Sequence, residues 1–562
     1  MAAEQSPRPK QSEIQNLPPS KSTSGRSVST PRSANGGGGG SRRETPDFHS
    51  TAAKLERAKE VYKAYEGHGE RPTIVEIVGW CFYELCSFFV LTLLIPVVFP
   101  LIISQISGTP TAPPQGWFKS FMGFDCPLRE MQLYQSLTEQ TIKVSNAEFS
   151  PLIWTSISWA MGLVLAGPIL AAASFHLDYG FNQHLITLAA VAAGALTCLP
   201  TGLFKTVKIF PLYIVLIVIA HSVAFTSHTR HLGLMLRGLT GPIVHKAKFS
   251  LRRIGSGQIS SWSAAVGGVG ASVISAFTYH MLRRDKQVQE GVDNHFLNLW
   301  IVTIFAGLKW LIGIFHVFLT NRSISISIPS NSELHILSIF KYPYAIATVI
   351  SGGFLSSFAT ISIFTAVLLF LIGQICFKPV LILYLLLIYF LVPLISLPLL
   401  HQFQIRIKAD ASKMLILGFI LSAATSATCF YFHAYTWRRH LVFVFAVLQG
   451  TAAAVLHAYG RALVLDCSPA GKESAISMWF SWMRSIGGCV GFTVAAVVPA
   501  RLQVSSGVVF CCAVVGGVVL IFGNVTDYDG AVAAGHVRDD SEKGSPVIGL
   551  DSRSESKELE SP

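Results

Sequence analysis

Four charged side chains stand out well inside the long apolar stretches of this 562-residue sequence: Glu84, Lys309, Arg461 and Arg484. An ionised group at the centre of a membrane-spanning helix costs about 2.5 to 3.5 kcal/mol on insertion scales, so each should face protein or water rather than lipid. A carboxylate in such a place can exchange a proton with a cavity, and a guanidinium can hold a carboxylate through two hydrogen bonds. These four residues are therefore candidates for solute binding or ion coupling.

Glu84 and Arg484 lie at matching depths, because each follows the start of its apolar stretch by about ten residues, at about 1.5 Å per residue. We predict that both face one central cavity, where Glu84 takes part in proton coupling and Arg484 holds the negative group of a solute. Three cations against one carboxylate favour an anionic or zwitterionic solute. The alternative is that these charges only lock helices together, or that Lys309 extends to the membrane interface.

Other polar side chains lie in the same apolar stretches. A lone histidine there packs through a hydrogen bond more often than it relays protons. Hydroxyl and amide groups can line a polar path or only bridge neighbouring helices. The residues are His221, His316, His457, Gln449, Ser356, Ser357 and Thr360.

The composition indicates a membrane protein. Hydrophobic residues make up 51% of the chain and charged residues 13%, and the mean hydropathy is +0.50, which is more apolar surface than a water-soluble fold buries. A spanning helix needs about 20 apolar residues, and twelve stretches approach this length. They run near residues 74–103, 152–175, 185–204, 209–227, 260–282, 296–320, 344–376, 380–400, 415–432, 441–465, 475–498 and 505–525. The seventh, which contains Gly352-Gly353, is too long for a straight span and must tilt or break.

The apolar region is flanked by polar ends. Residues 1–73 are basic and rich in Ser, Pro and Gly, residues 526–562 are polar, and both are predicted to be disordered tails. The loop 228–259 carries six Lys and Arg and no acidic residue. Together with the basic residues of the first tail, this loop predicts that both termini are cytosolic. The net charge of +12 therefore reports membrane topology, and nucleic acid is not an expected partner.

A short repeat predicts how the helices are grouped. Ser261-Trp262 precedes Gly267-Gly268 in the fifth stretch with the same spacing as Ser481-Trp482 precedes Gly487-Gly488 in the eleventh. Small residues allow close helix packing, so we take these four glycines as helix contacts. The matching positions predict two six-helix halves, residues 74–320 and 344–525, joined by a linker at 321–343. This is the plan of the major facilitator fold, which binds solute between its halves near the bilayer midplane.

No enzymatic or metal-binding motif is present. Gly471-Lys472 is followed by Glu473 and lacks the earlier glycine of a phosphate-binding loop, which disfavours an ATP-driven pump. The sequence has no HExxH zinc pair and no GxSxG nucleophile elbow, so we expect neither an enzyme nor a cofactor or metal site. Most of the ten cysteines lie in apolar stretches without ligand spacing, and we interpret them as packing residues. They are Cys81, Cys86, Cys198, Cys376, Cys429, Cys489, Cys511 and Cys512.

Three segments resemble the autophagy-related vacuolar effluxers of the major facilitator superfamily: WCFYELCSFFVLTLLIPVVFPL, GQISSWSAAVGGVG and RALVLDCSPAGKESAISMWFSWMRSIGG. The shared features are the Tyr83-Glu84 pair, Arg461, and the loop that leads to Arg484. The resemblance implies gradient-linked export of amino acids, with protons as a candidate coupling ion. It also implies a vacuole or another endomembrane rather than the plasma membrane.

The sequence departs from the facilitator pattern in the loop between the second and third stretches. Facilitators carry Gly-x-x-x-Asp-Arg-x-Gly-Arg-Arg there, whereas this chain keeps Asp178 and Gly180 and lacks every arginine. That loop normally gates the cytosolic side by ion pairing. A degenerate transporter fold that acts as a non-transporting receptor or scaffold is therefore the alternative function.

Overall fold

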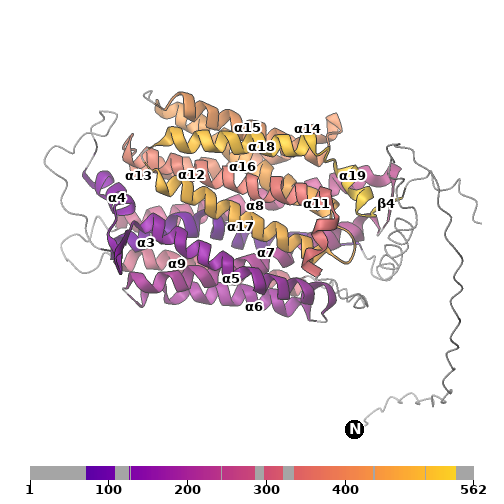
Figure 1. Cartoon of the computed structure of the whole chain (residues 1–562), viewed down its shortest axis with the longest axis horizontal. Coiled ribbons are helices and arrows are strands. Elements are labelled where there is room, and N and C mark those ends of the chain that lie inside the picture. The colour runs from indigo at the N-terminus through magenta and orange to yellow at the C-terminus, as the bar shows by residue number, and fades with distance from the viewer. Residues whose placement is uncertain are drawn as a thin grey trace, which may run out of the picture. The chain divides into compact units, whose positions relative to one another are not determined.

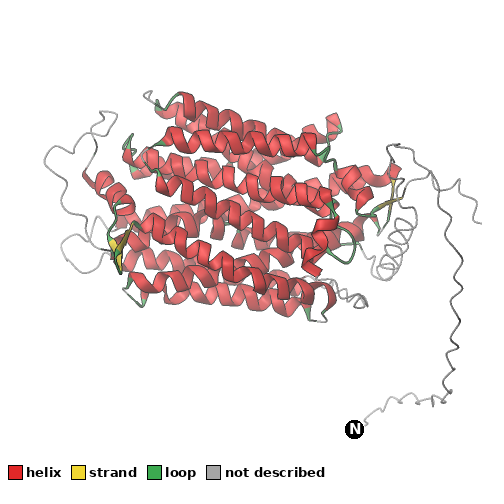
Figure 2. Ribbon diagram, viewed as in Figure 1, coloured by secondary structure: helices red, strands yellow, loops and turns green. Residues whose placement is uncertain are grey.

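The structure, a computed structural model, describes residues 71–107, 126, 128–180, 182–204, 206–241, 243–284, 296–319, 335–433, 437–499 and 501–538. Within these residues, twelve helices are long and apolar enough to cross a membrane. The prediction of an all-helical chain with twelve spans is confirmed. Figure 2 shows how small the contribution of strands is. The predicted N-terminal tail, apart from residues 71–73, and much of the linker lie outside the described residues.

The N-terminal half contains six spans and an excursion after the first. The first span is α2 (Ile74–Ser87), the π-helix η1 (Val90–Val98) and α3 (Phe99–Ile106). The excursion is α4 (Leu128–Thr138) and the hairpin β1 (Ile142–Val144) and β2 (Ala147–Phe149). The other spans are α5 (Pro151–Tyr179), α6 (Gln183–Cys198) with η2 (Leu199–Gly202), η3 (Val207–Ile209) with α7 (Phe210–Thr240), η4 (Lys246–Lys248) with α8 (Phe249–Arg284), and α9 (Phe296–Ile312) with α10 (Phe315–Leu319).

The C-terminal half follows the helix η5 (His335–Lys341). Its spans are α11 (Pro343–Thr348) with the π-helix η6 (Val349–Leu355) and α12 (Ser356–Gly373), α13 (Pro379–Leu391) with α14 (Pro393–Ile407), α15 (Ala411–Tyr431), α16 (Arg439–Asp466), α17 (Glu473–Val497) and α18 (Leu502–Phe522). The seventh span therefore stays continuous but contains a π-helical segment at Gly352-Gly353. Such segments often occur at functional sites.

Equivalent helices pack in equivalent ways in the two halves. The first span packs against the fifth as the seventh packs against the eleventh, and α6 packs against α7 and α9 as α15 packs against α16 and α18. The contacts between the halves include those of α5 with α17 and of α8 with α13 and α14. These two contacts exchange equivalent helices, as a pseudo-two-fold axis along the membrane normal requires. Figure 1 shows α5 and α17 side by side between the outer helices of each half.

The glycine pair of α8 lies where two helices approach closely. A Cβ added to Gly267 would be 2.9 Å from the Cβ of Phe88, at the end of α2. A Cβ on Gly268 would collide with the carbonyl oxygen of Phe390 in α13, across the boundary between the halves. The first glycine therefore allows close packing with a helix of its own half, and the second allows close packing with a helix of the other half.

The glycine pair of α17 repeats this arrangement. A Cβ on Gly487 would collide with the carbonyl oxygen of Phe354 in η6, which belongs to the same half. A Cβ on Gly488 would meet the Trp159 ring of α5, in the other half, at 3.4 Å. The glycine pairs of α8 and α17 therefore match in their spacing and also in the helices that they contact.

The C-terminal tail was predicted to begin at residue 526, and this is wrong for residues 527–538. They form the helix α19 (Asp527–Ala533) and the strand β4 (Val537–Arg538), which pairs in parallel with β3 (Val244–His245) between α7 and α8. The apolar residues Val244, Phe249, Ala531 and Val537 pack together there. Residues 539–562 lie outside the described residues.

A disulfide joins Cys126 to Cys376. Cys126 lies before α4 in the N-terminal half, and Cys376 lies between the seventh and eighth spans. The interpretation of Cys376 as a helix-packing residue is therefore wrong, because it is bonded across the two halves. We call the face of the molecule with this bond the disulfide face. The other face, where the first span begins at Ile74 and the twelfth ends at Phe522, is the terminal face. Figure 1 shows α4 at one end of the helices, and α19 and β4 at the other.

The close contact at Gly268 predicts a stability difference between two glycine-to-alanine variants. Gly268→Ala should cost about 1 to 3 kcal/mol, because the new methyl group must displace the α13 backbone. Gly517→Ala in α18 is the matched control, since a Cβ there has no neighbour within 4 Å, and it should be neutral or stabilising by up to about 1 kcal/mol. Thermal unfolding of the purified proteins in detergent measures both. Equal melting temperatures would contradict the assignment of Gly268 to a helix contact.

Candidate functional site

A cavity lies between the two halves. The space in it that the centres of water molecules can occupy is about 60 Å³. This is enough for roughly four waters. The N-terminal half contributes the first span, α5 and α8, and the C-terminal half contributes the seventh span, α13, α14, α16 and α17. The polar or aromatic lining residues include Phe88, Thr92, Trp159, Ser356, Ser357, Thr360, Phe364, Tyr389, His457 and Arg484.

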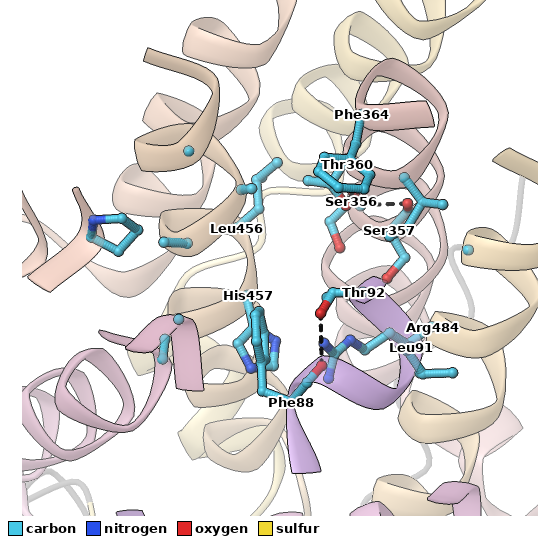
Figure 3. Close-up of a pocket in the computed structure, with 18 of the residues that line it drawn as sticks. Phe88, Leu91, Thr92, Ser356, Ser357, Thr360, Phe364, Leu456, His457 and Arg484 are labelled. Carbon is cyan, nitrogen blue, oxygen red and sulfur yellow. Dashed lines mark hydrogen bonds between the residues drawn. The ribbon is translucent and has the colours of Figure 1, made fainter. Parts of the chain in front are cut away.

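Arg484 brings a positive charge into this cavity from α17. Its guanidinium carbon lies 4.5 Å from the centre of the Phe225 ring, a cation–π contact with α7. In the part of the chain that the structure describes, Arg484 has no carboxylate partner and no hydrogen bond. Figure 3 shows its side chain reaching toward Thr92 and His457. The cavity therefore contains a cation whose hydrogen-bond donors are free for an anion.

Hydroxyl groups of α12 line another part of the cavity. Ser356 donates to the carbonyl oxygen of Gly352 at 2.5 Å, and Thr360 donates to that of Ser356 at 3.0 Å. Thr92 on the first span donates in the same way to Phe88 at 2.9 Å (Figure 3). Because these protons are used within the helices, the hydroxyl oxygens remain as hydrogen-bond acceptors toward the cavity. An ammonium group would suit them.

Glu84 does not line the central cavity. It is buried in α2, where it forms an ion pair with Arg461, and its Oε1 lies 3.4 Å from Nε2 of His228 and 3.8 Å from Nε2 of His457. His457 itself lines the cavity. The structure thus brings Glu84 next to Arg461 rather than Arg484, with the His457 ring between the carboxylate and the cavity.

Arg461 connects three helices across the boundary between the halves. It extends from α16 to Glu84 of α2, its Nε lies 3.3 Å from Oγ of Ser260 in α8, and its guanidinium carbon lies 4.6 Å from the centre of the Trp80 ring. A buried ion pair of this kind is strongly destabilised when one partner is removed. The Glu84–Arg461 pair therefore holds the halves together on the terminal side of the cavity.

Lys309 lies away from the cavity. Its Nζ donates to the carbonyl oxygen of Gly270 in α8 at 2.5 Å and lies 4.9 Å from the centre of the Phe89 ring. The ammonium group of Lys309 thus links α9 to α8 and to the first span. This placement fits helix packing better than solute binding.

Asp178 lies at the terminal end of α5 and is completely buried. Its carboxylate lies 3.4 Å from Nε of Arg230 and 2.9 Å from Nε2 of His335, and it accepts a hydrogen bond of 3.2 Å from the backbone N–H of Ser474. Arg230 of α7 therefore supplies the cation that the loop itself lacks, and Ser474 belongs to the other half. Gly180 ends α5, where a Cβ would collide with the carbonyl oxygen of His176.

Ion pairs close the terminal face between the halves. Arg237 at the end of α7 pairs with Glu473 at the start of α17, and Nε of Arg252 lies 2.8 Å from Oδ1 of Asp466 at the end of α16. We call these two pairs, together with the Asp178–Ser474 contact, the terminal gate. Every contact of the gate has one partner in each half, so opening this face requires all of them to break.

The C-terminal segment α19–β4 adds to this closure. Arg253 of α8 donates two hydrogen bonds to the carboxylate of Asp527, at 2.6 and 2.8 Å, and also pairs with Asp410 at 2.8 Å. Nε2 of His536 donates to the carbonyl oxygen of Ser468 at 2.6 Å. Burial lowers the pKa of His536 well below its usual range, and the nearby arginines add to this effect, so the ring is neutral. The segment therefore bridges α8 and the turn that follows α16.

Sequence reasoning missed the gate partners and the disulfide. Each contact joins residues that lie far apart in the sequence, such as Arg237 with Glu473 or Cys126 with Cys376. The available signal was the presence of acidic residues at helix ends in the C-terminal half opposite the basic loop 228–259. This signal indicates that ion pairs can form there, but it does not show which residues pair with each other.

Comparison with known proteins adds little. No protein-family model matches the chain, and no curated protein matches it in sequence. One similar solved structure is the human organic anion transporter MFSD10 (TETRAN), with a TM-score of 0.46 and 13% identity over 79% of this chain and 98% of that chain. This likeness is too low to assign a family.

The bidentate contact of Asp527 predicts how the C-terminal segment responds to a neutral substitution. Asp527→Asn should loosen α19 and β4, because Arg253 loses a charge-assisted partner, and trypsin should cleave after Arg538 roughly tenfold faster. Asp529→Asn is the matched control in the same helix, since the hydrogen bonds of Asp529 within the described residues are to the local Thr526. Mass spectrometry of timed digests measures the rates. Equal cleavage of the two variants would contradict the role assigned to Asp527.

Proposed function

We propose that the protein is a secondary-active transporter of a small solute that carries a carboxylate, anionic or zwitterionic, with the major facilitator plan. The observation that carries this proposal is Arg484, a cation without a charged partner among the described residues, facing a cavity between two pseudo-symmetric halves. A cation buried among apolar side chains is costly unless an anion joins it. A bound carboxylate offsets that cost and is held by two parallel hydrogen bonds.

The surroundings of Arg484 support a zwitterion. The hydroxyl oxygens of Ser356 and Thr360 line the same cavity and accept hydrogen bonds, whereas Arg484 donates them. An amino acid presents a carboxylate and an ammonium group that match these two sets. The resemblance to amino-acid effluxers agrees with this chemistry, and both lead to amino acids as the first solutes to test.

Alternating access supplies the transport step. In the present state, the terminal gate and α19–β4 hold the halves together at the terminal face. Solute bound at Arg484 would be released to that face when these ion pairs separate and the halves rock about the cavity. Protonation of Glu84 would weaken its pair with Arg461 and so couple proton movement to this rearrangement.

The orientation follows from two features. Basic residues are frequent at the terminal face, which favours the cytosol on that side. The Cys126–Cys376 disulfide lies at the opposite face, and disulfides persist in oxidising compartments rather than in the cytosol. We propose that the disulfide face meets the lumen of a vacuole or a related endomembrane compartment, and that amino acids leave it toward the cytosol.

The same disulfide favours a second candidate function, because it ties together the two halves at the face where they would separate. A non-transporting receptor or scaffold would keep the transporter fold and a fixed conformation. Exchange of labelled amino acids across reconstituted vesicles separates the two functions. Exchange under both oxidising and reducing conditions supports transport, and its absence under both supports the receptor.

Two substitutions of buried cations should have opposite effects on binding and stability. Arg484→Gln should weaken the apparent affinity for the solute roughly tenfold to a hundredfold, as expected for the loss of a charged hydrogen-bonding partner. It should leave the melting temperature unchanged or higher, because an unpaired cation is removed. Lys309→Gln is the control, and it should lower the melting temperature with affinity within about twofold of the wild type. If both variants lower the melting temperature and neither changes the affinity for the solute, Arg484 does not bind solute.

Glu84→Gln tests the coupling role. The variant should keep solute exchange, which moves no net proton, and lose accumulation driven by a pH gradient. Since it leaves Arg461 unpaired, it should also lose about 3 to 5 kcal/mol of stability, which the double variant Glu84→Gln/Arg461→Met should recover. A double variant that is stable and still accumulates solute with the pH dependence of the wild type would show that Glu84 only locks the helices.

A further inference from the structure

A second, smaller pocket lies wholly within the N-terminal half, near the terminal face. Its volume is about 20 Å³, space for roughly one water. Polar side chains of α6, α7 and α10 line it, including His184, Thr187, Ser227, Arg230, His231 and His316. None of these residues lines the central cavity. We call this space the side pocket.

A row of buried rings leads from the side pocket to Glu84. The ring centres of His316 and Tyr83 are 4.5 Å apart, as are those of Tyr83 and His228. His228 then approaches the carboxylate of Glu84, with 3.4 Å between Nε2 and Oε1, and His457 lies on the other side at 3.8 Å. His457 lines the central cavity. The row therefore connects the two cavities through one carboxylate.

Several polar atoms of the row are buried without a hydrogen-bond partner in the described part of the chain. They include the Tyr83 hydroxyl and Nδ1 of His228 and of His457, whereas Nε2 of each histidine faces the Glu84 carboxylate. Buried polar atoms are nearly always paired in proteins, with ordered water if not with protein. So many unpaired atoms along one line, next to a pocket of water size, indicate a path for water and protons rather than packing alone.

We propose that this row is a proton path by which Glu84 exchanges protons with the terminal side through the side pocket, separately from the solute cavity. The inference rests on the proposed function and specifies the proton as its coupling ion. A proton enters from water in the side pocket at His316 and passes His228, by ring rotation or a bridging water, to the Glu84 carboxylate. There it neutralises the charge that holds Arg461. Transfer to His457 releases it into the central cavity.

The path does not require the halves to separate. The terminal gate closes the central cavity toward the terminal face, whereas the side pocket is built from one half only. Protons can thus reach Glu84 while solute cannot pass. Coupling requires that the onward transfer to His457 takes place only after the Glu84–Arg461 pair has separated, because otherwise protons would cross without solute. Among the described residues, the groups in contact with the Glu84 carboxylate are His228 from α7, and His457 and Arg461 from α16. Cys81 and Tyr83 of α2 and His221 of α7 are further titratable groups around it. Arg484 of α17 lies beyond them, on the Phe225 ring.

The chain offers a matched pair of histidines for a test. His316 lies on the path, whereas His221 is equally buried in α7 but packs on Phe225 and Trp310. The variants His316→Phe and His221→Phe keep an aromatic ring at each position and remove the nitrogens. Thr187→Leu is a second test of the path, because it should fill the side pocket while the histidines remain.

The measurement uses proteoliposomes and a radiolabelled mixture of the common L-amino acids, and compares exchange with accumulation driven by a pH gradient. His316→Phe and Thr187→Leu should lower the initial rate of pH-driven accumulation roughly tenfold or more and leave exchange within about twofold of the wild type, while His221→Phe changes neither. The path is contradicted if the folded variants accumulate solute like the wild type, or if the wild type exchanges without any pH-driven accumulation. No exchange by the wild type would instead overturn the proposed function itself.

Discussion

The high cost of an ionised side chain in a low-dielectric interior governs this structure. Glu84 and Arg461 share that cost by pairing with each other across two helices from different halves. Arg484 lies at the cavity and lacks such a partner among the described residues. We propose that this contrast between a paired and an unpaired buried cation distinguishes the residue that holds helices together from the residue that binds solute.

The same electrostatic rule organises the terminal face. Basic residues of α7 and α8 meet acidic residues at the ends of α16 and α17. Apolar side chains of α7, α8 and α16 also pack together near this face, so ion pairs and apolar contacts close it jointly. These paired groups are almost fully buried, so separating them is costly unless water or new partners reach the charges. The glycine contacts between α8 and α13, and between α17 and α5, lie deeper and can remain close while the ends move apart. We propose that the halves rock about these contacts.

The sequence predicted features that depend on local composition and spacing. The twelve spans follow from apolar length, and the two halves follow from the glycine repeat. Depth along a helix placed Glu84 and Arg484 at one level, but depth does not fix the direction in which a side chain points around the helix axis, so the partner of Glu84 was missed. The roles of Cys376 and Asp527 depend on contacts between distant segments, and no local pattern reveals them. The histidines of the N-terminal half looked like packing residues because their alignment exists only in three dimensions.

The central claim is that Arg484 receives the carboxylate of a solute. The most direct measurement is thermal unfolding of the purified protein with pairs of amino acids and their amides, which differ only in the carboxylate. The account predicts that at least one amino acid raises the melting temperature of the wild type, that its amide does not, and that Arg484→Gln responds to neither. An amino acid and its amide that stabilise the wild type equally, or an Arg484→Gln variant that still responds to the amino acid, would contradict it.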